Sequence, residues 1–236
     1  MDKIETFREW VGKSDNIVFF GGAGVSTESG IPDFRSVDGL YNQKYDYPPE
    51  EILSHSFFMK NPEVFYKFYR EKLEIKGVKP NITHYKLAEL EKAGKLRAIV
   101  TQNIDGLHQL AGSEKVLELH GTLLRNYCSR CRKPYDGDIT KTKGVPRCDC
   151  GGVIRPDIVL YEEALNERTI SEAVYAIRMA EVLIVGGTSL SVYPAAGLIN
   201  YYRGDKLVLI NKTPTPYDRN ADLVINDSLG SVFSQI

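Results

Sequence analysis

GGAGVSTESGIPDFR, residues 21–35, is the stretch that decides the fold of this chain. It follows the apolar run 17–20 and begins like the phosphate-binding turn of a dinucleotide fold, in which glycines let the backbone approach a pyrophosphate. Gly22 and Gly24 supply the first two glycines of that fingerprint, but Thr27 stands where the third is expected. The stretch therefore predicts a nucleotide-binding turn that does not continue into the usual helix.

The second half of the same stretch predicts a loop. Gly30 and Pro32 disfavour a long helix, because proline lacks the amide hydrogen that a helix interior needs. We expect this loop to carry Asp33, Phe34 and Arg35 back over the nucleotide position. The acidic residue that a dinucleotide-binding dehydrogenase places roughly 20 residues further on, for the ribose, is also missing in its usual form. A hydride-transferring dehydrogenase is therefore disfavoured.

Six short runs of branched aliphatic residues predict a parallel sheet. The runs are nearly continuous, which is typical of strands buried on both faces, and helical patterns separate several of them. The predicted strands are residues 17–20, 98–100, 116–119, 182–185, 207–210 and 223–225, and the predicted helical segments include 4–11, 83–93 and 171–180. The fold class is therefore α/β, with a Rossmann-like doubly wound parallel sheet.

Polar residues and glycines follow each of these runs. The letters after the runs are GGAG, TQNID, HG, GGTSL, NK and ND. In a doubly wound fold, ligands bind beyond the carboxyl ends of the strands. The sequence therefore predicts a site along one edge of the sheet.

Two segments interrupt the alternation of strands and helices. Residues 36–80 are aromatic and helical in pattern, and residues 121–158 contain all the cysteines. We expect both to be insertions that form a smaller lobe, made of a helical module and a zinc ribbon, within a single domain 1–236. The large Rossmann-like lobe then comprises approximately residues 1–35, 81–120 and 159–236, and a cleft separates the two lobes.

The four cysteines have the spacing of a metal site. Cys128 and Cys131 are separated from Cys148 and Cys150 by sixteen residues, and two such pairs can place four thiolates around zinc. A closed four-sulfur site is structural, because no position remains for water or substrate. The second pair has a single intervening residue, which tightens the chelate. The alternatives are two disulfides or four free thiols, and the lack of a signal peptide disfavours disulfides.

Charge and composition limit the function classes. The chain has 236 residues, 42% of them hydrophobic, and 30 Lys and Arg balance 31 Asp and Glu. This balance gives no basic surface for nucleic acid or membranes, so we expect neither as a direct partner. The N-terminal residues contain no apolar signal segment, and no run approaches the roughly 18 residues of a membrane span. We expect a cytoplasmic protein.

Several motifs together resemble the sirtuin family, the NAD-dependent protein-lysine deacylases. They are GAGVSTESGIPDFR, TQNIDGLH, ELHG, the cysteine ribbon, RPDIV, GTSLSVYPAA and INKTPTP, in the family's order over almost the whole chain. The resemblance implies a deacetylase that transfers the acetyl group of a lysine to ADP-ribose and releases nicotinamide. It also implies NAD as co-substrate, structural zinc, and an acyl-lysine protein or peptide as partner. We expect the protein to be a monomer.

The resemblance also assigns residues. It implies His120 as the general base and Asn103 as a second catalytic residue, although a lone histidine is more often structural and an isolated Asn-x-Asp more often forms a turn. Residues implied to bind NAD are Ala23, Thr27, Phe34, Arg35, Gln102, Ile104, Asp105, His120, Thr188, Ser189, Asn211 and Asp227. Residues implied to clamp an extended peptide between the lobes are Val159, Leu160 and Val192, by strand addition.

Two positions depart from the family pattern. The family commonly has Phe-Gly-Glu where this chain has Tyr161-Glu162-Glu163, and the added carboxylate predicts a preference for basic residues beside the target lysine. Family members that remove succinyl or malonyl groups carry Tyr-x-x-Arg, which aligns here with Tyr69 and Lys72. Lysine lacks the forked geometry of arginine, so we favour a packed tyrosine and a solvated lysine.

Three other function classes remain as alternatives. A protein ADP-ribosyltransferase would use the same NAD pocket, and a deacylase for longer or acidic acyl groups would use the same base. A zinc-ribbon nucleic-acid binder would explain the cysteines but leaves the polar strand ends unexplained, and the charge balance lacks a basic footprint.

Overall fold

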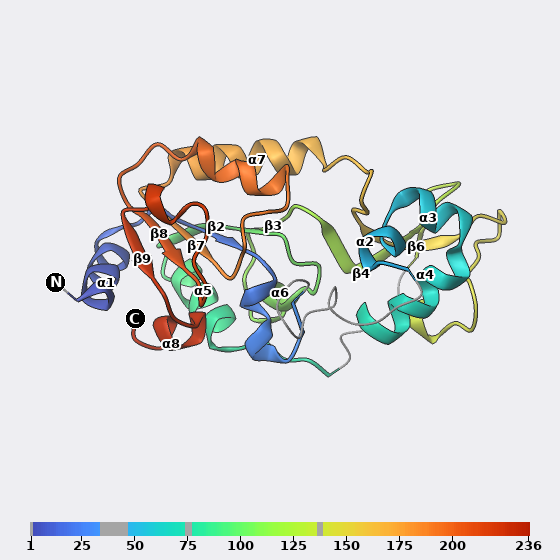
Figure 1. The fold of residues 1–236 in the computed structure, drawn as a ribbon, viewed down its shortest axis with the longest axis horizontal. Coiled ribbons are helices and arrows are strands. Elements are labelled where there is room, and N and C mark those ends of the chain that lie inside the picture. The colour runs from blue at the N-terminus through green and yellow to red at the C-terminus, as the bar shows by residue number, and fades with distance from the viewer. Residues whose placement is uncertain (1, 34–46, 74–76, 136–138) are drawn as a thin grey trace.

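A six-stranded parallel sheet forms the large lobe of the computed structural model, which describes residues 2–33, 47–73, 77–135 and 139–236 (Figure 1). Its strand order is β3-β2-β1-β7-β8-β9, and all neighbouring pairs are parallel. The strands are β1 Ile17–Gly21, β2 Leu96–Thr101, β3 Val116–Glu118, β7 Val182–Gly186, β8 Leu207–Ile210 and β9 Leu223–Ile225. Each coincides with one of the six predicted runs, and this strand order confirms the doubly wound fold.

Helices cover both faces of this sheet. Ile17 and Phe19 of β1 pack in one core, and Val18 and Phe20 pack in the other, because successive strand residues point to opposite faces. The first core is covered by α1 Lys3–Lys13, α5 Ile82–Lys92 and α8 Leu229–Phe233, and the second by α7 Glu167–Met179 and the 3₁₀ helix η6 Ala195–Tyr201. Burial on both faces explains why the strands are almost uninterrupted apolar runs.

Side-chain caps mark where the long helices begin. Asp2 accepts a hydrogen bond from the backbone of Ile4 in α1, and Asn166 accepts one from Thr169 in α7. Asn81 caps α5, which completes a capping box with His84. Two shorter helices of this lobe are α6 Leu107–Leu110 and the 3₁₀ turn η7 Asp218–Asn220.

The small lobe contains a three-stranded antiparallel sheet and a group of short helices. Its strands, in the order β5-β4-β6, are β4 Gly121–Cys128, β5 Pro134–Tyr135 and β6 Ile154–Ile158. Its helices are α2 Pro49–Ile52, α3 His55–Lys60, α4 Pro62–Phe68, the π-helical turn η4 Tyr69–Leu73 and the 3₁₀ turn η5 Ile139–Lys141. Phe58, Phe65 and Tyr66 pack against Cys128 and Ile154 in one core. The helices and the cysteine ribbon therefore pack together in one lobe. The boundary residues given above for the two lobes stay predictions.

The loop after β1 contains short turns in place of a long helix, as the sequence predicts. Its 3₁₀ turns are η1 Ala23–Val25 and η2 Thr27–Ser29, and Gly30 follows with a left-handed φ of 89°. Phe34 and Arg35 lie outside the described residues. Within the described part of the chain, the helices are all too short or too polar to cross a membrane.

Candidate active site

The principal cleft lies where the order of the large sheet reverses. β1 and β7 are neighbours there, and the turns after them approach so closely that a Cβ on Gly24 would lie 2.8 Å from the Gly187 Cα. The Gly24 N–H donates to the Gly187 carbonyl at 2.8 Å. Gly24, which the sequence suggested as a phosphate-binding glycine, is therefore also required where the turns after β1 and β7 meet at the topological switch point.

This cleft extends from the strand ends into the space between the lobes. Its volume is about 870 Å³, which is of the size that encloses a large ligand. The sequence-predicted residues that line it are Ala23, Thr27, Gln102, Asn103, Ile104, Asp105, His120, Val159, Leu160, Thr188, Ser189, Val192, Asn211 and Asp227. Except for Phe34 and Arg35, which are not among the described residues, every residue predicted to bind NAD or peptide thus lies along one cleft.

His120 follows β3 and presents a neutral imidazole to the cleft. Its Nδ1 lies 3.0 Å from the Gln102 carbonyl, and because a carbonyl only accepts, Nδ1 carries the hydrogen. Burial lowers the pKa of His120, partly offset by the hydrogen bond to Gln102. At neutral pH the Nε2 atom is therefore an unprotonated nitrogen, as a general base requires.

Asn103 and Asp105 are joined by a residue that the sequence did not single out. The Ser26 hydroxyl donates to the Asp105 carboxylate at 2.7 Å and accepts from the Asn103 amide at 3.1 Å. All three residues are buried. Burial raises the pKa of Asp105, while the hydrogen bonds from Ser26 and the Leu107 N–H lower it. The only sequence signal for Ser26 is its place beside Thr27 in the glycine-rich loop.

The other half of the cleft is held by hydrogen bonds between strand ends. The Gln102 amide donates to the Thr188 hydroxyl at 3.0 Å. Asn211 contacts the Thr188 backbone twice, as acceptor at 3.2 Å and donor at 2.6 Å. Ser189 hydrogen-bonds Ser191 at 2.7 Å, and Asp227 accepts from Ser231 at 2.9 Å near the start of α8. The ends of β2, β7 and β8 are therefore tied together around the cleft.

The segment after β6 forms one wall between the lobes. The Val159 N–H donates to the His120 carbonyl at 2.9 Å, and the Leu160 N–H donates to the Glu163 carboxylate at 2.8 Å. No donor among the described residues reaches the Val159 carbonyl. Val192, which follows β7, also lines this cleft. The two predicted clamp stretches therefore face one cleft, with one backbone acceptor unoccupied near His120.

Glu163 holds the chain of this wall in place through hydrogen bonds and ion pairs. Its carboxylate accepts two hydrogen bonds from the buried Arg155 guanidinium, at 2.5 and 2.9 Å, and contacts His55 Nδ1 at 2.8 Å. Burial acts to raise the pKa of Glu163, but the hydrogen bonds from Arg155, Leu160 and His55 outweigh it and lower the pKa to about 2. Glu163 is therefore an anion that supports the clamp. Neighbouring Glu162 points its carboxylate at Ser56, and its predicted preference for basic flanking residues stays a prediction.

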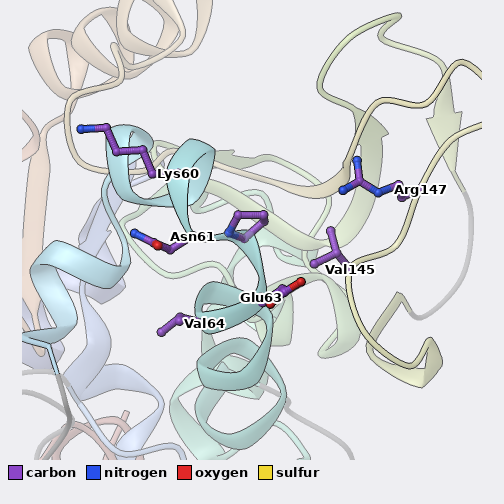
Figure 2. A pocket seen from close by; sticks show the side chains of 7 residues that line it. Lys60, Asn61, Glu63, Val64, Val145 and Arg147 are labelled. Atoms are coloured by element: carbon purple, nitrogen blue, oxygen red, sulfur yellow. The ribbon is translucent and has the colours of Figure 1, made fainter.

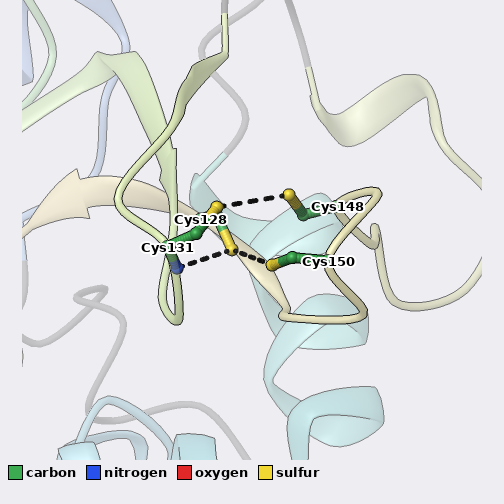
Figure 3. A group of neighbouring side chains, drawn as sticks. All are labelled: Cys128, Cys131, Cys148 and Cys150. Atoms are coloured by element: carbon green, nitrogen blue, oxygen red, sulfur yellow. Dashed lines mark hydrogen bonds between the residues drawn. The ribbon is translucent and has the colours of Figure 1, made fainter.

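The four cysteines converge at the tip of the small sheet (Figure 3). Their sulfur atoms all lie within 4.8 Å of one another. The Cys128 and Cys150 sulfurs are 3.5 Å apart, and the Cys131 and Cys148 sulfurs are 3.6 Å apart. Four ligands at about 2.3 Å from zinc have sulfur separations of roughly 3.8 Å in a tetrahedron, so this cluster fits zinc despite the short Cys-x-Cys spacing.

Tyr69 and Lys72 lie in different surroundings. Tyr69 is 3% exposed and stacks on Phe65 in the core of the small lobe. Lys72 is half-buried and lines the cleft. The tyrosine is thus packed as we favoured, whereas the lysine faces the site. The π-helical geometry of Tyr69–Leu73 separates the two side chains more than the regular helix that the sequence suggested.

A second hollow lies away from the strand ends. It has a volume of about 530 Å³ and lies between α4 and the chain that leads to β6 (Figure 2). Lys60 and Arg147 stand on its two sides, and Glu63 lies between them. None of the residues predicted from the sequence lines it, so the candidate chemistry belongs to the larger cleft.

The fold and the site define a nucleotide-binding α/β protein whose cleft continues between two lobes. A model of the Sir2 family matches residues 22–194. The whole chain is 58% identical over 241 residues to the NAD-dependent protein deacetylase of Clostridium acetobutylicum, 98% of which is covered. It is 60% identical over 240 residues to the NAD-dependent protein deacetylase of Clostridium perfringens, with the same coverage of 98%.

Solved structures give the same result. A Sir2 structure with deacetylated p53 peptide and 3′-O-acetyl ADP ribose matches with a TM-score of 0.92 and 41% identity, covering 99% of this chain and 97% of that one. A Sir2 structure with p53 peptide and NAD⁺ matches with a TM-score of 0.87 and 40% identity, covering 100% and 97%. The chain belongs to the Sir2 family.

Proposed function

We propose that the residues of the principal cleft carry the activity of this chain, which is an NAD-dependent protein deacetylase. The acetyl group passes from a lysine nitrogen to ADP-ribose, and nicotinamide leaves. The observation that supports this assignment is the convergence of His120, Asn103 and Asp105 with the clamp residues in one cleft. A base, a polar pocket and a peptide wall are the three parts that the reaction requires.

His120 is proposed as the general base. Its Nε2 is unprotonated because Nδ1 is engaged with Gln102, so the nitrogen can take the proton of a ribose hydroxyl. Burial lowers the pKa of His120, which keeps the imidazole in this form over a wider pH range. The Gln102 contact also fixes the ring plane.

Asn103 and Asp105 are proposed to hold the nicotinamide and its ribose. The Ser26 hydroxyl orders both side chains, so they reach the substrate in a defined arrangement. Ile104 contributes apolar surface to the same pocket. Residues of this kind accelerate a reaction chiefly by orientation, since a displacement of about 1 Å can cost roughly a hundredfold in rate.

The rest of the dinucleotide is proposed to lie along the switch point. Ala23 and Thr27 present the short turns after β1, and Gln102, Thr188 and Ser189 present polar groups toward the phosphates. Asn211 and Asp227 lie further along, where the adenosine is expected. We expect Phe34 and Arg35 to complete the pocket.

The acetylated peptide is proposed to enter between the two walls as an extended strand. The free Val159 carbonyl would accept the N–H of the acetyl-lysine amide, which would place the acetyl oxygen beside the nicotinamide ribose. Leu160 and Val192 would hold the aliphatic part of the lysine. The cysteine cluster would hold zinc as a structural ion, which supports the small lobe and supplies no catalytic position.

Mass spectrometry with NAD and an acetyl-lysine peptide tests this function. We expect loss of the acetyl group and release of nicotinamide in equal amounts in the wild type, and we expect loss of the acetyl group to be abolished in His120→Ala. Nicotinamide release by the wild type with the acetyl group retained would instead indicate ADP-ribosyl transfer. Persistent deacetylation by the variant would contradict the role of His120.

One observation favours a second acyl class. Lys72 lines the cleft, so its ammonium can approach an acidic acyl group, although without the forked hydrogen bonding of arginine. The expected result is that succinyl-lysine peptide is a weaker substrate than acetyl-lysine peptide, and that Lys72→Ala lowers only the succinyl activity.

A cytoplasmic location and a monomeric state stay predictions from the sequence.

A further inference from the structure

Glu162 has a backbone conformation that side chains rarely adopt. Its φ is 73°, in the left-handed region, where a Cβ-bearing residue is strained. Such strain persists where the surroundings hold the residue in place, and it is frequent in ligand clamps. Glu162 lines the principal cleft, two residues after the predicted clamp residue Leu160.

The side chain of Glu162 reaches across to the helical module. Its carboxylate accepts hydrogen bonds from the Ser56 N–H at 2.8 Å and from the Ser56 hydroxyl at 3.0 Å. No Lys, Arg or His among the described residues forms an ion pair with it. The two hydrogen bonds to Ser56 are therefore the described interactions that hold this exposed carboxylate.

The backbone on either side of this contact is joined to the same module. The Tyr161 N–H donates to the Leu53 carbonyl at 3.0 Å, and the His55 N–H donates to the Tyr161 carbonyl at 3.0 Å. Glu162 itself differs, because neither its N–H nor its carbonyl has a partner among the described residues. The side chain of Glu162 is thus held by hydrogen bonds, whereas its backbone N–H and carbonyl at the cleft make none with the described residues.

We propose that Glu162 is a positioning residue for the peptide substrate, and that its contact with Ser56 holds the turn 161–163 in the shape that receives the peptide main chain. The inference rests on the proposed function, since it assigns the peptide to this cleft. The carboxylate acts through the turn and need not touch the acetyl-lysine. Loss of the contact should therefore weaken peptide binding without altering the NAD half of the site.

Steady-state kinetics of Glu162 and Ser56 variants test this inference. Glu162→Ala and Ser56→Ala should each raise the peptide KM about three- to tenfold, with kcat and the NAD KM within about twofold of wild type, because hydrogen bonds of this kind are individually modest. The double variant should have a peptide KM no higher than that of the more impaired single variant, because both changes remove the same contact and their effects are not additive. Glu162→Gln should retain near wild-type KM, since its amide can accept from the Ser56 N–H and donate to the Ser56 hydroxyl. Glu167→Ala, an exposed carboxylate outside the cleft, is the matched control.

Three results would overturn the inference. Equal losses in Glu162→Gln and Glu162→Ala would mean that charge acts on the substrate directly. Wild-type KM in Glu162→Gly, with impairment in Glu162→Ala, would mean that backbone strain alone matters. Additive effects of the Glu162 and Ser56 changes on the peptide KM would mean that the two residues act independently of each other.

Calorimetry with the acetyl-lysine peptide and the same variants measures how the contact affects peptide affinity, independently of catalysis. If the wild type binds the peptide but does not deacetylate it, the proposed function fails while the variants still report on the contact. If the wild type is active and no variant changes peptide affinity, the positioning role fails and the function stands.

Discussion

The Ser26 hydroxyl connects two buried polar side chains on which the proposed reaction depends. It is donor to Asp105 and acceptor for Asn103, so neither group is left without a partner in the interior. A buried carboxylate is stabilised as an anion by such donors, and Ser26 lowers the pKa of Asp105 against the effect of burial. One small residue thus orients both side chains and partly offsets the rise that burial causes in the pKa of Asp105.

Replacement of Ser26 by alanine should therefore damage both stability and activity. We expect Ser26→Ala to lower the free energy of unfolding by about 1–3 kcal/mol, since two buried groups lose a hydrogen bond. Turnover should fall by roughly tenfold or more through misplacement of Asn103 and Asp105. Urea unfolding and nicotinamide release measure the two effects.

Ser113→Ala is the matched control for this change. Ser113 is 4% exposed, and its hydroxyl has no partner among the described residues, so its removal should be neutral or slightly stabilising. If the two serine variants had the same stability and turnover, the network through Ser26 would be unimportant.

At this scale the sequence predicted residues that directly follow strands. Asn103, Asp105 and His120 could be placed because the ends of parallel strands meet at one edge of a sheet. Ser26 and Glu162 could not be assigned their contacts. Their partners lie 79 and 106 residues away, and such contacts exist only after the loops have packed together.

The cysteine ribbon is an element whose two halves meet at one cluster of sulfur atoms. Cys128 ends β4, Cys131 follows in the adjacent turn, and Cys148 and Cys150 lie on the chain that leads to β6. Cys128 and Cys148 also belong to the aromatic core of the helical module. An ion that holds the four sulfurs therefore also supports packing beneath the cleft.

Removal of zinc should unfold this ribbon and abolish deacetylation indirectly. We expect one zinc per chain by metal analysis, and chelation should expose residues 129–150 to protease, because structural zinc contributes roughly 10–16 kcal/mol in small zinc domains. Cys150→Ser should behave like the chelated protein, and Ser129→Ala, between two ligands, should retain metal and activity. A folded and active metal-free protein would contradict the structural role.

Regular elements were the most predictable feature of this chain. Apolar runs and capping residues determine strands and long helices locally, so the six strands and the helices α1, α5 and α7 match the predicted segments. The π-helical turn Tyr69–Leu73 was not predicted from the sequence, which suggested a regular helix there. Tyr69 packs in a core that also contains Cys128 and Ile154, and local sequence preference carries no information on contacts with such distant segments.

The nucleotide loop is tied to the interior of the large lobe through the start of α5. Asn81, at the start of α5, donates to the Val25 carbonyl at 2.8 Å and to the Ser29 hydroxyl at 3.0 Å, so this helix holds the loop after β1. The Asn81 N–H in turn donates to His84 Nδ1 at 3.2 Å. The ring of His84 packs against that of His108 in α6, with centroids 4.7 Å apart.

This buried histidine pair has unmet hydrogen-bonding groups. His84 and His108 are 0% and 1% exposed, and His84 Nε2 and both nitrogens of His108 have no partner among the described residues. Burial lowers the pKa of His84 to about 4. Burial, with a further contribution from His84, lowers the pKa of His108 to about 3. Both rings are therefore neutral in the folded protein at neutral pH.

Acidification should consequently destabilise the whole fold. Both histidines titrate near pH 6.5 in the unfolded chain, so between pH 6.5 and about 4 the unfolded state binds more protons than the folded state. The free energy of unfolding should be constant above about pH 7 and decrease below it, by on the order of 3 kcal/mol at pH 4 for His84 alone. Glu163 acts in the same direction from pH 4.5 downward, since its folded pKa is about 2.

Urea unfolding between pH 7.5 and 4.5 measures this dependence, and His108→Leu tests its origin. The variant removes one titrating ring and its unpaired nitrogens, so its unfolding free energy should fall less steeply below pH 6.5 than that of the wild type. Because α5 holds the nucleotide loop through Asn81, the NAD affinity of the wild type should weaken over the same pH range. An unfolding free energy that stayed flat from pH 7.5 to 4.5, or an unchanged slope in His108→Leu, would show that the buried pair does not control acid stability.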